Sequence, residues 1–66
     1  MIAEVLIENE KRRYRVSFLS NAKNEQYQYD MELNCIEEDH KGWSKINLPY
    51  AKAKELRRLN KIKLIV

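Results

Sequence analysis

The sequence feature that most constrains the fold is a strict alternation in the middle of the chain. From Tyr27 to Cys35, every second residue is apolar, and a polar residue stands at each position between them. Successive side chains of a β-strand point to opposite faces of the sheet, so the alternation predicts a strand with one buried face. The side chains expected on that buried face are Tyr27, Tyr29, Met31, Leu33 and Cys35.

Two more strands are expected before this one. The segments from Ile2 to Glu8 and from Arg12 to Ser20 are rich in β-branched and aromatic residues, which favour strands. A turn at Glu10 and Lys11 would bring the apolar side chains of both strands to one face. The cross-strand pairs expected from this turn are Ala3 with Phe18, Val5 with Val16, Ile7 with Tyr14, and Glu8 with Arg13.

The second strand is expected to pair with the third across the polar segment from Asn21 to Gln26. A register that unites the apolar faces sets Phe18 opposite Tyr27, Val16 opposite Tyr29, and Tyr14 opposite Met31. On the reverse face, the same register sets Arg15 opposite Asp30 and places Arg13 between Glu8 and Glu32.

This part of the chain also mixes basic and aromatic residues. Arg12, Arg13 and Arg15 together with Tyr27 and Tyr29 resemble the basic and aromatic surfaces that bind nucleic acids. In the expected register, however, the tyrosines point into the core and the arginines face carboxylates across the sheet. A structural role for these residues is therefore favoured over a binding role.

A fourth strand is expected from Trp43 to Leu48, after a turn that contains the only glycine, Gly42, where a positive φ is needed. The core face continues if Ile46 opposes Leu33 and Leu48 opposes Met31. The same register sets Trp43 beside Ile36 on the other face. This apolar pair is either covered by a helix or exposed for binding to a partner. Cover by the helix is favoured, because a small core needs its large side chains.

The stretch from Leu48 to Lys61 predicts one short helix, since Pro49 suits the first turn and the residues that follow favour helices. At about 100° per residue, Ala53, Leu56 and Leu59 share one side. The opposite side carries a cationic stripe at helical spacing, with further basic residues and one aromatic residue at its edge. The stripe comprises Lys54, Arg57, Arg58 and Lys61; Lys45, Lys52, Lys63 and Tyr50 flank it.

The final residues alternate again, with Ile62, Leu64 and Val66 apolar, and predict a short strand beside the first one. The whole chain, residues 1–66, is expected to be a single α+β domain. Its expected order is a four-stranded antiparallel meander, one short helix and a final strand, β-β-β-β-α-β. This order of elements resembles that of small SH3-like or OB-like barrels.

Composition argues against catalysis and metal binding. With one glycine and one histidine, no phosphate-loop, dinucleotide-binding, metalloprotease or nucleophile-elbow motif can be present. Cys35 is expected in the core and His40 in a solvated turn, so neither a Cys/His nucleophile nor a metal site is expected. Glu37, Glu38 and Asp39 are expected to form a solvated acidic turn. We therefore expect a non-enzymatic protein without cofactor or metal.

The net charge of +3 is unevenly distributed. Residues 1–40 contain five Lys or Arg and nine Asp or Glu, a net −4, whereas residues 41–66 contain eight and one, a net +7. Glu55 is the only acid in the second part, so the cationic stripe lacks the carboxylates that usually neutralise a surface helix. A solubilising helix face remains the simplest explanation, but an unneutralised stripe favours an anionic partner.

Two binding functions are compatible with this charge. The favoured one is a module that sets its basic helix against a nucleic acid backbone. The alternative is a small inhibitor or adaptor, of the kind that phages and plasmids encode, which docks on an acidic surface of a host protein through Trp43 and Ile36 or the arginines.

Residues 1–8 contain no basic segment and no long apolar segment, so neither a signal peptide nor a membrane span is expected. The expected location is cytoplasmic. The sheet edges could also pair two copies into a homodimer.

Overall fold

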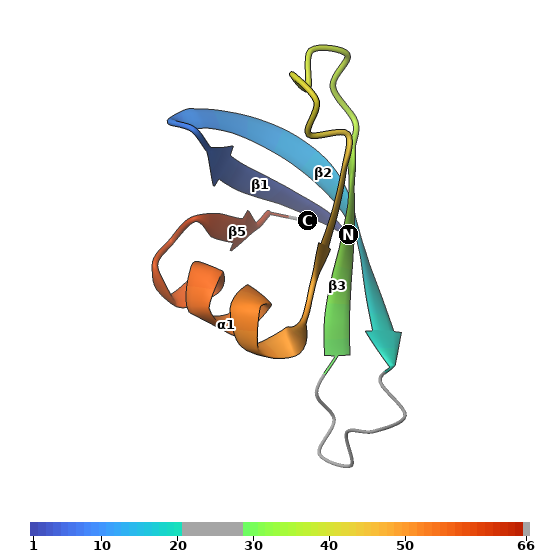
Figure 1. Ribbon diagram of the computed structural model, residues 1–66, viewed down its shortest axis with the longest axis vertical. Coiled ribbons are helices and arrows are strands. Elements are labelled where there is room, and N and C mark those ends of the chain that lie inside the picture. The colour runs from blue at the N-terminus through green and yellow to red at the C-terminus, as the bar shows by residue number, and fades with distance from the viewer. Residues whose placement is uncertain (21–28, 66) are drawn as a thin grey trace.

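The computed structural model describes residues 1–20 and 29–65, and these residues form one antiparallel sheet and one helix (Figure 1). The strands lie in the order β4-β3-β2-β1-β5. The expected order of elements along the chain is confirmed, and so is the place of the last strand beside the first. The elements are β1 (Ile2–Ile7), β2 (Glu10–Ser20), β3 (Tyr29–Cys35), β4 (Lys45–Leu48), α1 (Tyr50–Arg58) and β5 (Ile62–Leu64).

The longest strand, β2, is shared between two parts of the sheet. Its residues from Glu10 to Arg15 pair with β1, and those from Tyr14 to Ser20 pair with β3. Figure 1 shows the sheet curled along this strand, with β1 and β5 turned away from β3 and β4. The helix α1 packs against β3 and β5 on the concave side. The result is an α+β fold of the small, barrel-like type.

The core lies between α1 and the concave face of the sheet. Tyr14, Met31 and Leu33 are its largest fully buried side chains, and they come from the alternating positions of β2 and β3. Ala53 is the residue of α1 that is buried against them, and its small side chain lets the helix approach the sheet closely. The buried apolar residues are Ala3, Val5, Tyr14, Val16, Met31, Leu33, Ala53 and Ile62.

The expected registers of the first two hairpins are wrong. Val5 faces Arg12 instead of Val16, and Val16 faces Leu33 instead of Tyr29. Both differences amount to four residues, and an even shift keeps every side chain on the expected face of the sheet. The first hairpin turns at Glu8 and Asn9, two residues earlier than expected, and both have positive φ, as two-residue hairpin turns favour.

The charged pairs expected on the reverse face are therefore also wrong. Arg15 faces Asn34 instead of Asp30, and Arg13 faces Glu4 instead of lying between Glu8 and Glu32. Phe18 faces Met31 instead of Tyr27, and Tyr27 itself lies outside the described residues. The register of the third hairpin is confirmed, with Leu33 opposite Ile46 and Met31 opposite Leu48. Gly42 has the expected positive φ, 86°.

The helix is shorter than the sequence indicates, and contacts at both ends explain its length. At the start, the backbone N–H of Tyr50 donates to the carboxylate of Asp30 on β3 at 2.9 Å. At the end, Asn60 has a φ of 59°, and the N–H groups of Asn60 and Lys61 donate to the carbonyls of Arg57 and Leu56. This is a Schellman motif, which terminates the helix before Lys61. Among the described residues, no helix is long and apolar enough to cross a membrane.

One buried charge was not expected. Arg12 occupies a core-facing position of β2 and is only 5 % exposed. Its Nε donates to the carbonyl of Asp39 at 3.1 Å, and its Nη2 donates to the Glu10 carboxylate at 2.6 Å. The Lys41 ammonium binds the same carboxylate at 2.8 Å and, with Arg12, lowers the pKa of Glu10. Arg12 thereby fastens the turn after β3 to the start of β2.

We expect Arg12→Ala to lower the free energy of unfolding by about 2 kcal/mol, because hydrogen bonds to charged groups contribute about 1.5–3 kcal/mol each and one partner, Glu10, stays half solvated. Urea unfolding followed by circular dichroism measures the change. The matched control is Arg15→Ala, since Arg15 is exposed on the same strand. Equal effects of the two substitutions would contradict the structural role of Arg12.

The Tyr14 phenol provides a second test. It is fully buried and donates to the carbonyl of Trp43 at 2.7 Å. Burial, with a smaller effect of Cys35, raises the pKa of Tyr14 above its ordinary value of 10.0. The unfolded chain then loses this proton at a lower pH than the folded chain, so the fold should lose stability as the pH rises above 10.0.

We expect this alkaline loss of stability to be smaller in Tyr14→Phe than in the wild type. At neutral pH the variant should be about 1 kcal/mol less stable, because it lacks the hydrogen bond to Trp43. Urea unfolding between pH 7 and pH 11 measures both effects. Contact with Glu10 raises the pKa of Lys41 as well, but this contribution is common to both proteins. Parallel pH profiles would contradict the burial of the Tyr14 phenol.

Candidate functional site

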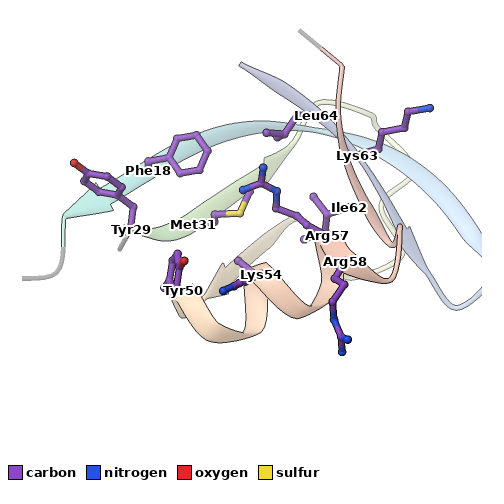
Figure 2. Close-up of a pocket in the computed structure, with 11 residues that line it drawn as sticks. Phe18, Tyr29, Met31, Tyr50, Lys54, Arg57, Arg58, Ile62, Lys63 and Leu64 are labelled. Atoms are coloured by element: carbon purple, nitrogen blue, oxygen red, sulfur yellow. The ribbon is translucent and has the colours of Figure 1, made fainter. Parts of the chain in front are cut away.

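The described residues form a groove of about 680 Å³ between α1, β5 and the adjoining ends of β2 and β3 (Figure 2). One part of its lining is apolar or aromatic and comes mainly from the sheet. The other part is cationic and comes from α1 and β5. The lining residues are Phe18, Tyr29, Met31, Tyr50, Ala53, Lys54, Arg57, Arg58, Ile62, Lys63 and Leu64.

The groove lies where α1 leaves part of the concave face uncovered. The helix packs against β3 and β5, and it crosses β3 instead of running along it (Figure 1). Val16, near the middle of β2, is 7 % exposed, but Phe18, two residues farther on the same face, is 42 % exposed. Tyr29 at the start of β3 is 41 % exposed. The end of the core face that carries these two rings therefore stays open.

Four basic side chains line the groove. Lys54, Arg57 and Arg58 come from α1, and Lys63 comes from β5. In Figure 2 the Arg57 guanidinium reaches over the groove toward Met31, whereas Arg58 and Lys63 point away from it. Lys63 lies across from Glu4 of β1 in the sheet register and on the opposite face of the sheet from Ile62 and Leu64. None of the ion pairs formed within residues 1–20 and 29–65 involves these four side chains. Within these ranges, their positive charge is not neutralised by a carboxylate.

Tyr50 stands at the mouth of the groove, on the first turn of α1. Its ring lies beside Lys54, whose Nζ is 6.0 Å from the ring centroid, at the limit of a cation–π contact. Its backbone N–H is the group that Asp30 caps. The cap fixes the start of the helix relative to β3, and it thereby positions Tyr50 and Lys54 relative to Tyr29.

The structure divides the basic residues that the sequence analysis grouped together. Lys54, Arg57, Arg58 and Lys63 share the groove with Tyr50. Lys61 follows the helix terminus and lines a smaller hollow of mixed charge beside Glu4 and Lys11. Lys45 and Lys52 lie within ion-pairing distance of carboxylates, at 3.6 Å from Glu32 and 3.8 Å from Glu55 respectively.

The expectation that the helix covers Trp43 and Ile36 is wrong. Trp43 is 38 % exposed and Ile36 is 45 % exposed. The hydrogen bond from the N–H of Cys35 to the carbonyl of Ser44 continues the β3–β4 pairing toward these residues. The helix α1 packs on the concave face instead, because Ala53 meets the core formed by Met31 and Leu33 there. Trp43 and Ile36 therefore form an exposed apolar pair.

The acidic turn lies at the far end of the sheet from the groove (Figure 1). Its contacts are with β2: the Glu37 carboxylate accepts the backbone N–H of Arg13, and the Asp39 carbonyl accepts Arg12. Cys35 is half-buried near this turn, and its thiol donates to the carbonyl of Glu37 at 3.6 Å. In the described part of the chain, no group of three or more His, Cys, Asp or Glu side chains is placed to hold a metal ion.

The aromatic part of the groove was not expected from the sequence. The alternation correctly places Phe18 and Tyr29 on the core face, but it does not indicate how much of that face the helix covers. The exposure of the two rings follows from the packing of α1 against β3 and β5.

Comparison of the chain with protein-family models, with curated proteins and with solved structures gives no significant match. The function is therefore inferred from the site itself.

We expect substitutions at the two groove rings to leave the fold intact. Phe18→Leu and Tyr29→Leu should each lower the free energy of unfolding by less than about 1 kcal/mol, because the rings are half-exposed and leucine keeps most of the apolar contact. Met31→Ala should cost about 2–5 kcal/mol, because it opens a cavity in the core. Urea unfolding measures all three, and a loss at Phe18 or Tyr29 as large as that at Met31 would mean that the groove is closed in solution.

Proposed function

We propose that this protein is a non-enzymatic module that binds nucleic acid in the groove between α1 and the sheet. The observation that carries the proposal is a groove that exposes two aromatic rings and that Lys54 and Arg57 reach, with Arg58 and Lys63 at its rim. None of these four basic side chains has an ion-pair partner in the described structure. Basic and aromatic side chains on one concave surface are typical of nucleic-acid sites. A basic helix face that served only solubility would not require exposed aromatic rings beside it.

The electrostatic part of the binding follows from the phosphate backbone. Each Lys or Arg that contacts a phosphate releases condensed counterions, so the logarithm of the binding constant falls with the logarithm of the salt concentration. The slope is about 0.7 to 0.9 for each phosphate contacted. A site based on Lys54 and Arg57, with Arg58 at its rim, therefore predicts moderate affinity, a clear dependence on salt and little preference for sequence.

A second candidate function is docking on another protein. The observation in its favour is the exposure of Trp43 and Ile36, since a solvent-exposed tryptophan beside an isoleucine is a suitable anchor for an interface. In that case the protein would act as an inhibitor or adaptor. Retention of one acidic protein from a lysate by the wild type, and its loss on Trp43→Ala, would favour this function over the first.

We expect Arg57→Gln/Arg58→Gln to weaken the binding of labelled DNA and RNA and to reduce the salt slope by about 0.7 to 0.9 for each phosphate that the variant no longer binds. Fluorescence anisotropy at several salt concentrations measures both quantities. The matched control is Arg13→Gln/Arg15→Gln, which removes the same charge from exposed positions of β2 away from the groove. If neither nucleic acid binds at low salt, or if the two double variants behave alike, the proposed function is wrong.

A further inference from the structure

We propose that the groove selects single-stranded nucleic acid, with bases stacked on Phe18 and Tyr29 and the phosphates held by the basic residues of α1. This inference rests on the proposed function and makes it more specific, because it names the form of nucleic acid that the groove fits. DNA and RNA single strands share the chemistry concerned, namely an exposed base face next to a phosphate.

The two rings are placed so that neighbouring bases of one strand can reach both. Phe18 faces Met31 across the β2–β3 pairing, and Tyr29 lies two residues before Met31 on the same face. Such diagonal neighbours have side chains about 7–8 Å apart at their bases. Figure 2 shows both rings side by side at one end of the groove. With 42 % and 41 % of their surfaces exposed, they offer area for stacking without leaving the sheet.

Lys54 and Arg57 face the groove beside the rings, so the groove has a part for bases and a part for phosphates. Arg57 extends over the floor toward Met31, and Lys54 lies near Tyr50 at the mouth. A guanidinium group can bind a phosphate through two hydrogen bonds and can also stack on a base. A strand that lies along α1 therefore has partners for both of its chemical parts.

A duplex has no equivalent fit. Its base faces are stacked on one another, and only base edges and the sugar–phosphate backbone are accessible at its surface. It could contact the cations, but it could not use Phe18 and Tyr29. The floor side chains Met31, Ile62 and Leu64 are apolar and provide no hydrogen bonds to base edges. The groove should consequently accept different base sequences.

The test compares four ligands by fluorescence anisotropy at one salt concentration: labelled oligo-dT, labelled oligo-rU, a labelled DNA duplex of equal phosphate number, and inorganic polyphosphate as an unlabelled competitor that has no bases. We expect at least one of the two single strands to bind on the order of tenfold more tightly than the duplex, since stacking is available to it alone. We also expect polyphosphate, compared at equal phosphate concentration, to compete only weakly with the labelled single strands. The difference between oligo-dT and oligo-rU reports on the sugar.

The decisive variant is Phe18→Leu/Tyr29→Leu, with Trp43→Leu as the control, because Trp43 is an aromatic residue of similar exposure outside the groove. We expect the double variant to lose on the order of tenfold in single-strand affinity while its salt slope stays unchanged, and the control to bind like the wild type. Far-ultraviolet circular dichroism verifies that both variants are folded.

Two results would overturn the inference, and they have different meanings. Equal affinity for the duplex and the single strands, or wild-type affinity of the folded double variant, would show that the cations act without stacking, so the broader proposal of nucleic-acid binding would survive. No binding of any nucleic acid at low salt would remove both proposals.

Discussion

Partial cover of the concave face by α1 is the constraint on which the candidate site depends. The helix packs against β3 and β5 and leaves Phe18 on β2 42 % exposed and Tyr29 on β3 41 % exposed. The covered part of the concave face becomes the core, with Tyr14 and Leu33 completely buried. The uncovered part keeps the same apolar pattern but stays in contact with solvent. Core and groove are thus one continuous surface, divided where the helix begins.

Local contacts at the helix ends set where that division falls. Asp30 accepts the N–H of Tyr50 and so ties the first turn to β3, and Asn60 stops the helix by adopting a positive φ. If the helix continued to Lys61, the stripe of four basic residues expected from the sequence would form. Instead the chain turns into β5, so that Lys61 leaves the groove and Lys63 faces Glu4 on the opposite side of the sheet. The composition of the cationic side is therefore a consequence of helix termination.

Sequence patterns predicted the order of elements, the faces of the alternating side chains among the described residues and the register of β3 with β4. They failed where the pattern carries no information. An alternation has a period of two, so it cannot distinguish registers that differ by four residues, and both errors have this size. The positive φ of Glu8 and Asn9, which determines the first register, has only Asn9 as a weak signal.

The candidate site was predictable only in part, for a related reason. Composition and helical spacing identified Lys54, Arg57 and Arg58, because charge is visible in the sequence. The exposure of Phe18 depends on what covers it, and the burial of Arg12 depends on a turn more than twenty residues away. Both are properties of tertiary packing, and neither the hydropathy nor the charge of the residue itself indicates them.

The fold separates the carboxylates that make internal contacts from the basic side chains near the groove. Carboxylates are engaged by internal contacts at the end of the sheet remote from the groove, where Glu10 binds Arg12 and Lys41, and Glu37 accepts the N–H of Arg13. The basic side chains that line the groove have no such partners within the described residues. A long, rigid polyanion laid along the molecule would meet the acidic turn as well as the groove, and the two would oppose each other. A flexible strand can contact the groove alone, so electrostatics favours the same partner as the aromatic rings do, for an independent reason.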